Sequence, residues 1–392
     1  MAAERPERIV IVGAGPAGLA TARAYREHGG AGELTLLGAE RMLPYQRPPL
    51  TKGFLRGELD AEELPIESRR WFEDRGVCLR LAQSARAIDP AVGTVSLDGD
   101  VLAADAIVLA TGSEPLRAKL PGIDHAAVMT MRTYADSVRI ADSARRGACL
   151  LVLGTGFIGC EIAASLAMLG AGVTLVGQEP LPQAQRLGDG AGRRIAGWLA
   201  DLGVRLVMDA TVSAVHDGRT LELQDGRRLQ ADGVVLGTGV RPRAELAEQA
   251  GLALSDGAIA VDARMRARNS GASVLAVGDV ACAHNAVAGR RLRVEHWGDA
   301  LAHGEVAGRT LAGEDASWSS VPGFWSTIGE RTLKHAAWGD GYDSERLVDH
   351  GGGSFTVWYA RSDGVAVGVL THERDGDYER GRELIAAGEP AP

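Results

Sequence analysis

Ile9-Val10-Ile11-Val12-Gly13-Ala14-Gly15-Pro16-Ala17-Gly18 is the stretch of sequence that decides the fold. The apolar run predicts a buried strand, and the G-x-G-x-x-G pattern after it predicts a turn into a helix. Gly13 permits the tight turn, Gly15 lets the backbone approach a pyrophosphate, and Gly18 lets the helix pack closely on the strand. The free amides of the helix N-terminus then face the phosphates. The stretch therefore predicts a dinucleotide site.

The same arrangement returns far along the chain, where Leu150-Leu151-Val152-Leu153 precedes Gly154-Thr155-Gly156-Phe157-Ile158-Gly159. One G-x-G-x-x-G is a weak signal, but two in strand–turn–helix context predict two dinucleotides. A flavin and a nicotinamide coenzyme are the economical pair. Each unit also closes on an apolar strand that ends in Thr-Gly, which adds Thr111, Gly112 and Gly239 to the predicted site. The repeat indicates an internal duplication, with one domain inserted into the other.

The order of predicted elements indicates an α/β fold with two Rossmann-like dinucleotide-binding domains and a small C-terminal α+β domain. We assign residues 1–112 and 240–318 to a discontinuous FAD-binding domain and 113–239 to a NAD-binding domain. Residues 319–392, where tryptophans and alternating strands appear, form the C-terminal domain. Within the NAD-binding domain, a second helix is expected at about 190–201.

Composition and charge narrow the functional classes. The chain has 392 residues and a net charge of −9, which argues against nonspecific nucleic-acid binding. Its four cysteines form no C-x-x-C, so we expect no redox dithiol and no metal site. Reduced thiols and a polar start without a signal-peptide core favour a cytoplasmic location. The nearly uncharged run 148–177 fits a buried strand–helix–strand unit better than a membrane span.

Acidic residues after the second strand of each unit are candidates to bind ribose hydroxyls. In the first unit Ala39 stands at the usual acidic position, and Glu40 follows it. In the second unit Gly177 stands there, and Glu179 is the nearest acid. No Arg or Lys occurs from 177 to 185, so a 2′-phosphate has no obvious local partner. We therefore expect a preference for NADH, with NADPH possible.

Six motifs, taken in order, resemble one known family: V-G-A-G-P-A-G, P-Y-Q-R-P-P-L-T-K, A-T-G, G-T-G-F-I-G-C-E, V-G-D and E-H-W. The family is that of the FAD-dependent pyridine-nucleotide oxidoreductases, in its ferredoxin-reductase branch, which includes the reductases of putidaredoxin and of Rieske dioxygenases. The resemblance covers nearly the whole chain. It implies non-covalent FAD, hydride transfer from nicotinamide to flavin, and electron delivery to an iron–sulfur ferredoxin. That ferredoxin would supply a haem monooxygenase or a Rieske dioxygenase.

The same resemblance implies roles for single residues. Lys52 lies beside the flavin ring, Arg47 helps to hold FAD, and Glu161 lies near flavin and nicotinamide. A buried Lys52–Glu161 pair would satisfy both charges, although Glu161, expected on the first turn of its helix, could merely stabilise a helix N-terminus. Asp279 holds the ribityl chain, or else caps a helix. The other implied cofactor contacts come from the glycine turns and from flanking positions, namely Pro16, Ala17, Ala39, Ala85, Arg132, Phe157, Ile158 and Trp297, the last of which opens a helix toward the flavin.

Arg290, Arg291 and Arg293 form a basic run between the two FAD motifs of an acidic chain. Such a run could be a solvated loop, or it could steer an acidic ferredoxin to the flavin edge. Phe324 and Trp325 resemble the family segment at the flavin face, and core aromatics are an equal alternative. Two other functions stay open: an NADH oxidoreductase with a small-molecule acceptor of the monodehydroascorbate or quinone type, and an NADH-responsive binding module.

Overall fold

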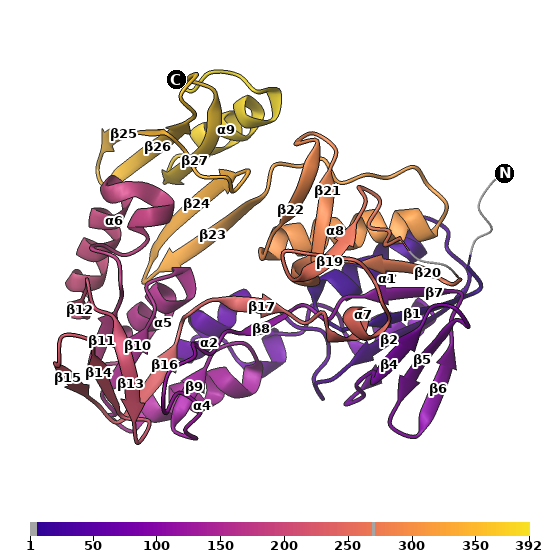
Figure 1. Cartoon of the computed structure of the whole chain (residues 1–392), viewed down its shortest axis with the longest axis horizontal. Helices are drawn as coiled ribbons and strands as arrows, with labels where there is room; N and C mark the ends of the chain where they lie inside the picture. Colours follow the sequence, from indigo (N-terminus) through magenta and orange to yellow (C-terminus); the bar gives the residue numbers. More distant parts are fainter. Residues whose placement is uncertain (1–5, 269–270) are drawn as a thin grey trace. The chain divides into compact units, whose positions relative to one another are not determined.

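The computed structural model describes residues 6–268 and 271–392, which form two compact units. The first unit contains the described residues up to Gln46, Pro65–Glu114 and the described part of Arg241–Gly323. The second contains Arg47–Leu64, Pro115–Val240 and Phe324–Pro392. Each unit is built around its own sheets (Figure 1).

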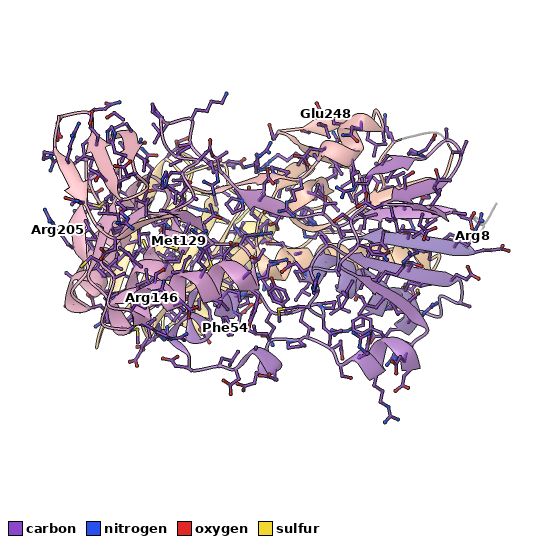
Figure 2. The ribbon with its side chains drawn as sticks, turned by 90° about the horizontal axis from the view of Figure 1, so that it is seen from below. Arg8, Phe54, Met129, Arg146, Arg205 and Glu248 are labelled. Atoms are coloured by element: carbon purple, nitrogen blue, oxygen red, sulfur yellow. The ribbon has the colours of Figure 1, made fainter. Side chains whose placement is uncertain are left out.

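The main sheet of the first unit is parallel and has five strands in the order β20-β7-β1-β2-β3. Its strands are β1 (Arg8–Val12), β2 (Glu33–Gly38), β3 (Val77–Leu81), β7 (Ala106–Leu109) and β20 (Ser273–Ala276). Their continuous apolar runs suit strands that are buried on both faces. Solvent is reached at the edge strand β3, where Cys78 is exposed, and at strand ends such as Arg8, which is labelled in Figure 2. The Arg8 guanidinium pairs with Asp105 at 2.6 Å.

Two helices pack on each other in the first unit, α1 (Pro16–Glu27) and α8 (Trp297–Leu311). The contact depends on glycines of α8. A Cβ atom at Gly304 would lie 2.4 Å from Ala17 O, and one at Gly308 would lie 2.6 Å from Thr21 O. Any side chain at these positions would force the helices apart. The glycines therefore set how closely α8 approaches the helix that follows the first phosphate turn.

Smaller sheets complete the first unit. One is a three-stranded sheet of β4 (Ala87–Asp89), β5 (Thr94–Leu97) and β6 (Asp100–Ala103). The other has the strands β18 (Leu254–Ser255), β19 (Ala258–Val261), β21 (Ala281–Asn285) and β22 (Arg290–Arg293). Short helices α3 (Arg69–Asp74) and α7 (Glu245–Gln249) lie on the connecting segments.

The second unit repeats the parallel plan in the order β12-β11-β10-β16-β9. Its strands are β9 (Val128–Thr130), β10 (Leu150–Leu153), β11 (Val173–Val176), β12 (Arg205–Val207) and β16 (Gly233–Leu236); Met129 of β9 and Arg205 of β12 are labelled in Figure 2. The helices are α2 (Gly53–Arg56), α4 (Tyr134–Arg145), α5 (Phe157–Met168) and α6 (Ala184–Asp201). A hairpin sheet of β13 (Val212–His216), β14 (Thr220–Leu223) and β15 (Arg228–Gln230) follows β12.

The C-terminal sheet of the second unit is antiparallel at every pairing described, in the order β23-β24-β27-β26-β25. Its strands are β23 (Gly323–Ile328), β24 (Arg331–Ala337), β25 (Ser344–Gly351), β26 (Ser354–Ala360) and β27 (Ala366–His372), and α9 (Asp375–Ala387) packs against β27. The α/β class with two Rossmann-like sheets and an α+β C-terminal part is therefore confirmed.

Two local expectations were wrong. Helix α6 begins at Ala184 rather than near 190, because Gly188 adopts φ 80° and joins two helical segments across a kink. The buried Tyr359 hydroxyl donates to the carbonyl of Leu187 at 2.8 Å and so satisfies a group that the kink frees. The prolines of residues 44–50 predict a loop without helix, but Pro48–Thr51 forms a 3₁₀ turn whose first residues are prolines.

Between residues 6 and 268 and from 271 to 392, no helix is long and apolar enough to cross a membrane. The same residues contain no group of three or more His, Cys, Asp or Glu side chains arranged to hold a metal ion.

Candidate active site

The first phosphate turn has the geometry that its sequence predicts. A Cβ atom at Gly13 would lie 2.1 Å from Ala110 O, and one at Gly18 would lie 2.0 Å from Gly13 O. Gly13 also has φ 121°, a conformation that side chains disfavour. At Gly15, by contrast, nothing lies within 4 Å of the position of a Cβ. The open space beside Gly15 fits the close approach of a pyrophosphate.

The second turn is a near copy of the first. A Cβ at Gly154 would lie 2.4 Å from Gly237 O, and one at Gly159 would lie 1.9 Å from Gly154 O. Gly156 is again the open position, with its nearest neighbour 3.8 Å away. Thus glycine is needed for packing at the first and third positions of both turns, whereas the second position is open in both.

The threonines of the two Thr-Gly dipeptides make similar hydrogen bonds. The Thr111 hydroxyl donates to Arg243 O at 2.7 Å, and the Thr238 hydroxyl donates to Leu116 O at 2.6 Å. Gly112 and Gly239 both have positive φ, at 68° and 92°. Each threonine therefore ties the end of a central strand to the segment that enters or leaves its unit.

Asp279 lies in the first unit, just after β20. It belongs to a short 3₁₀ turn, Gly278–Val280, whose N-cap is Val277, so Asp279 does not cap a helix. Its carboxylate is 9% exposed and accepts a hydrogen bond from the Ser113 hydroxyl at 2.6 Å. Trp297 is the first residue of α8, as predicted, with His296 at the N-cap. A buried anchored carboxylate and a helix N-terminus are thus available in this unit.

In the first unit, Glu40, which is predicted to bind a ribose hydroxyl, already contacts other protein groups. The Tyr45 hydroxyl donates to Glu40 Oε2 at 2.7 Å. Ala39 is exposed and Ala85 half-buried. Ala82, three residues before Ala85, has φ 55°, and its amide donates to Glu40 O at 3.0 Å. Glu40 therefore lies in a shaped turn at the ends of β2 and β3.

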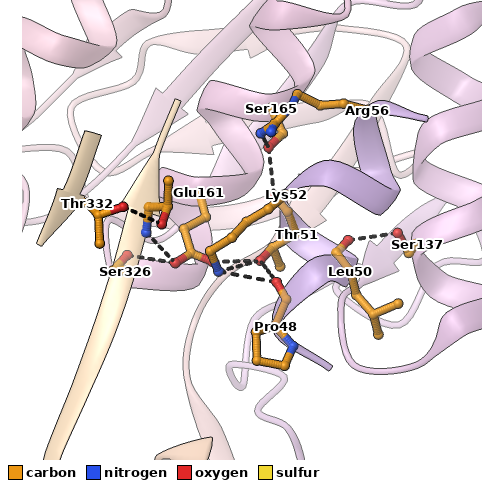
Figure 3. Close-up of polar contacts among 11 residues, drawn as sticks. Pro48, Leu50, Thr51, Lys52, Arg56, Ser137, Glu161, Ser165, Ser326 and Thr332 are labelled. Atoms are coloured by element: carbon orange, nitrogen blue, oxygen red, sulfur yellow. Dashed lines mark hydrogen bonds and ion pairs between the residues drawn. The ribbon is translucent and has the colours of Figure 1, made fainter. Parts of the chain in front are cut away.

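Lys52 and Glu161, 109 residues apart in sequence, form an ion pair in the second unit (Figure 3). The Lys52 Nζ to Glu161 Oε2 distance is 2.6 Å, and the side chains are 16% and 3% exposed. Thr51 Oγ1 donates to the same oxygen at 2.5 Å. The other oxygen, Oε1, accepts from Ser326 Oγ at 2.7 Å and from the Thr327 amide at 3.2 Å. This carboxylate is therefore buried with a full set of donors.

Glu161 does not serve as a helix-terminus carboxylate. Helix α5 begins at Phe157, so Glu161 lies on the second turn of the helix. The expectation that it lies on the first turn was therefore wrong. Its described partners come from the 48–52 segment and from β23 rather than from the free amides of α5. The ion-pair alternative is the one that the geometry matches.

Backbone anchors hold the 47–52 segment. The Ser165 hydroxyl donates to Thr51 O at 2.6 Å, and the Ser137 hydroxyl donates to Leu50 O at 2.7 Å (Figure 3). Arg47 donates to Arg132 O at 2.7 Å, which brings together two residues that were predicted to contact FAD. The position of Lys52 is therefore set by helices α4 and α5.

At the N-terminal end of α5, one contact was not predicted. The Arg186 guanidinium lies 5.5 Å from the ring centroid of Phe157 and 5.3 Å from that of Phe324, and the two rings meet edge to face at 4.5 Å. Arg186 lies one residue beyond the stretch 177–185, which contains no Arg or Lys. Ile158, one of the predicted cofactor contacts, is 45% exposed.

Glu179 has a structural partner. Its Oε2 accepts a hydrogen bond from the Gln185 amide at 2.8 Å, near the start of α6. The basic run 290–293 is a strand, β22, rather than a loop, and it pairs with β21. Arg291 and Arg293 are exposed, and Arg293 contacts Glu295 at 3.0 Å.

Comparison with known proteins agrees with this architecture. Residues 7–304 match the family described as pyridine nucleotide-disulphide oxidoreductase. The chain is 34% identical to the anthranilate 1,2-dioxygenase system ferredoxin–NAD(+) reductase component of Burkholderia cepacia, over 97% of this chain and 94% of that one. It is 32% identical to a probable ferredoxin reductase, CtmF, of Castellaniella defragrans, over 97% and 93%.

Among solved structures, the covalent putidaredoxin reductase–putidaredoxin complex matches with a TM-score of 0.91 and 28% identity, over 98% of this chain and 94% of that one. The duplicated dinucleotide turns and the buried acid–base pair define a nucleotide-dependent oxidoreductase. The chain belongs to the pyridine nucleotide-disulphide oxidoreductase family, whose members are FAD-dependent. Its relatives named above are ferredoxin reductases.

Proposed function

We propose that the protein is an NADH-dependent ferredoxin reductase, which passes electrons from NADH through FAD to an iron–sulfur ferredoxin. The observation that carries the proposal is the Lys52–Glu161 pair, because it holds Lys52 against a buried, fully hydrogen-bonded carboxylate on the helix that follows the second phosphate turn. The named activities of the relatives, ferredoxin reduction in dioxygenase systems among them, support the same reaction.

The residues of the first unit fit FAD. Gly15 leaves the space that a pyrophosphate needs, and Asp279 presents a buried carboxylate for a polyol hydroxyl. The N-terminus of α8, at Trp297, offers a positive dipole that stabilises negative charge. When bound, FAD accepts a hydride and releases electrons singly. The set Gly13, Gly15, Pro16, Ala17, Gly18, Ala39, Glu40, Ala85, Thr111, Gly112, Asp279 and Trp297 is our proposal for its contacts in this unit.

In the second unit we propose that Gly154, Gly156, Phe157, Ile158, Gly159, Glu179 and Gly239 bind the nicotinamide coenzyme. Arg47, Lys52, Arg132 and Glu161 complete the proposed cofactor set. The protein's own contribution is to hold the Glu161 carboxylate in place between the 48–52 segment and β23, so that Lys52 keeps its position. The open faces of Gly156 and Ile158 leave room for a ligand beside this pair.

The predicted division also belongs to this proposal: an FAD-binding domain of 1–112 and 240–318, a NAD-binding domain of 113–239 and a C-terminal domain of 319–392. Each contains one of the three five-stranded sheets. A cytoplasmic location is proposed on the sequence argument from reduced thiols, and all four cysteines are free.

The partner is proposed to be an acidic ferredoxin that docks near Arg290, Arg291 and Arg293 and supplies a haem monooxygenase or a Rieske dioxygenase. The crystallised complex of a structural relative contains putidaredoxin. Exposed arginines on β22 would attract an acidic partner over a distance comparable to the Debye length, about 10 Å at moderate salt.

The test is an anaerobic titration followed by turnover. Adding NADH to the FAD-loaded protein should bleach the flavin absorbance. Cytochrome c should then be reduced faster when putidaredoxin is present than when the protein and cytochrome c are mixed alone. A protein that oxidises NADH only with ferricyanide or a quinone would instead be a small-molecule reductase. A protein that binds NADH without bleaching would be a binding module.

A further inference from the structure

Gly177 and Thr155 occupy one another's space at the end of β11. A Cβ atom at Gly177 would lie 2.4 Å from Thr155 Cγ2 and 2.8 Å from Thr155 Oγ1. Both residues are buried. An acidic side chain, which Rossmann-like sheets often carry at this position to bind the ribose 2′-hydroxyl, therefore cannot enter here while Thr155 keeps its place.

The Thr155 side chain brings a hydroxyl to the neighbourhood that the missing acid would occupy. Thr155 is the second residue of the Gly154–Gly159 turn, and its side chain is 6% exposed. Within the described part of the chain, no hydrogen bond to its hydroxyl is found. A hydroxyl can donate and accept, so it can pair with a ribose hydroxyl without carrying the negative charge that repels a 2′-phosphate.

The other nearby acids are positioned differently. Glu179 uses one carboxylate oxygen to accept the Gln185 amide, and its carbonyl accepts the Asp209 amide at 3.1 Å. Gly177 donates its amide to Val207 O and accepts from Ala210 at its carbonyl. The backbone of Gly177 is thus paired on both sides, and the Glu179 carboxylate is held by the start of α6.

We propose that the Thr155 hydroxyl replaces the acid at position 177 as the group that binds the adenosine ribose, which makes this enzyme prefer NADH only modestly and accept NADPH. The inference rests on the proposed function, because it assigns the coenzyme end of that same site. Thr155 and Gly177 then determine together whether NADH or NADPH is preferred. Because the two residues share one space, a larger residue at position 177 requires a smaller one at position 155.

The first experiment compares Thr155→Val, which keeps the shape and loses the hydroxyl, with Thr155→Ser, which keeps the hydroxyl. Flavin reduction is followed with NADH and with its 2′-deoxyadenosine analogue. Because one hydrogen bond is lost, Thr155→Val should raise the KM for NADH about 3- to 10-fold and leave kcat unchanged. Thr155→Ser should have a KM near that of the wild type. With the deoxy analogue, Thr155→Val and wild type should be alike. Equal KM values for NADH in wild type and Thr155→Val would overturn the proposal.

The second experiment tests the shared space. Gly177→Glu alone should impair coenzyme binding, whereas Thr155→Ala/Gly177→Glu should restore it and raise the ratio of kcat/KM for NADH over NADPH at least about tenfold, which corresponds to one charged contact. Circular dichroism shows whether each variant folds. A fully active, NADH-selective Gly177→Glu single variant would show that Thr155 does not hold the space. If wild type bleaches with neither coenzyme, the proposed function itself fails, which is a separate outcome.

Discussion

Lys52 Nζ lies 2.6 Å from Glu161 Oε2, and Ser326 Oγ lies 2.7 Å from the other oxygen of the same carboxylate. Two segments that are remote from Glu161 in sequence therefore contact its carboxylate. Burial makes this arrangement sensitive, since removing one partner leaves the other charge with incomplete compensation.

Replacing Lys52 with Met or Glu161 with Gln should slow flavin reduction by NADH while FAD stays bound. An uncompensated buried charge costs roughly 3–5 kcal/mol of local stability, so the remaining partner should leave its place and bleaching should slow. Stopped-flow bleaching of the flavin band measures it. Lys334→Met is the matched control, because Lys334 pairs with Asp375 at 2.7 Å with side chains 38% and 74% exposed. Reduction at the wild-type rate in both pair variants would exclude a role for the pair.

Ser326→Ala should slow flavin reduction about tenfold, because one donor to the Glu161 carboxylate is lost while the Thr327 amide remains. Ser326→Thr should restore the rate. Thr332→Val serves as control, since the Thr332 hydroxyl contacts Thr327 Oγ1 at 2.9 Å and not Glu161. If Thr332→Val slows the reaction as much as Ser326→Ala, the effect comes from general disturbance of the β23–β24 hairpin.

Gly15→Ala should leave the protein folded but prevent it from retaining FAD. The added methyl meets no protein atom within 4 Å, yet it fills the space beside the turn that a pyrophosphate needs. The FAD-to-protein ratio after gel filtration is the measurement. Gly197→Ala, on α6 and equally open, should keep FAD. Gly18→Ala should instead destabilise the fold, because its Cβ would lie 2.0 Å from Gly13 O.

His303 should make the protein less stable as the pH falls. Burial lowers its pKa to about 4, and neither ring nitrogen has a hydrogen-bond partner within residues 6–268 and 271–392. Because the unfolded histidine binds a proton below its ordinary pKa of about 6.5 and the folded one does not, stability is lost between about pH 6.5 and pH 4. From pH 7 to pH 5 this amounts to about 2 kcal/mol.

The measurement for His303 is urea unfolding of wild type and His303→Leu at pH 7 and pH 5. The variant should lose less stability on acidification than wild type. His125→Gln, at an exposed histidine, is the control and should follow wild type. Identical pH dependence in wild type and His303→Leu would mean that this histidine is protonated in the folded state.

Arg291→Ala should raise the KM for putidaredoxin and weaken its dependence on salt, with NADH and ferricyanide kinetics unchanged. Arg293→Ala should do so less, because Arg293 already contacts Glu295 at 3.0 Å and Asp256 O at 3.0 Å. Initial rates across ionic strength test this, since steering by charge weakens with salt. A triple Ala variant at 290, 291 and 293 that serves the ferredoxin like wild type would move the docking site elsewhere.

The glycine turns could be predicted from sequence because every residue that shapes them is local. The strand predicted at residues 9–12 lies within β1 (Arg8–Val12) for the same reason. The partners of Glu161 could not all be found, since Ser326 is 165 positions away and a serine in a strand carries no signal of its own. The early start of α6 was also missed, because the kink at Gly188 is stabilised by the distant Tyr359.

Pairing of β7 with β20 joins Ala106 to Ser273, so the flavin-side sheet is completed by a strand made long after its neighbours. At about 5–20 residues per second, a ribosome takes roughly 10–30 s to bridge that interval. The second parallel sheet lies within 128–236 and is synthesised before β20 emerges. During translation the nascent chain therefore exposes an unpaired edge of β7 until β20 arrives, and we expect FAD capture to be one of the last events of biogenesis.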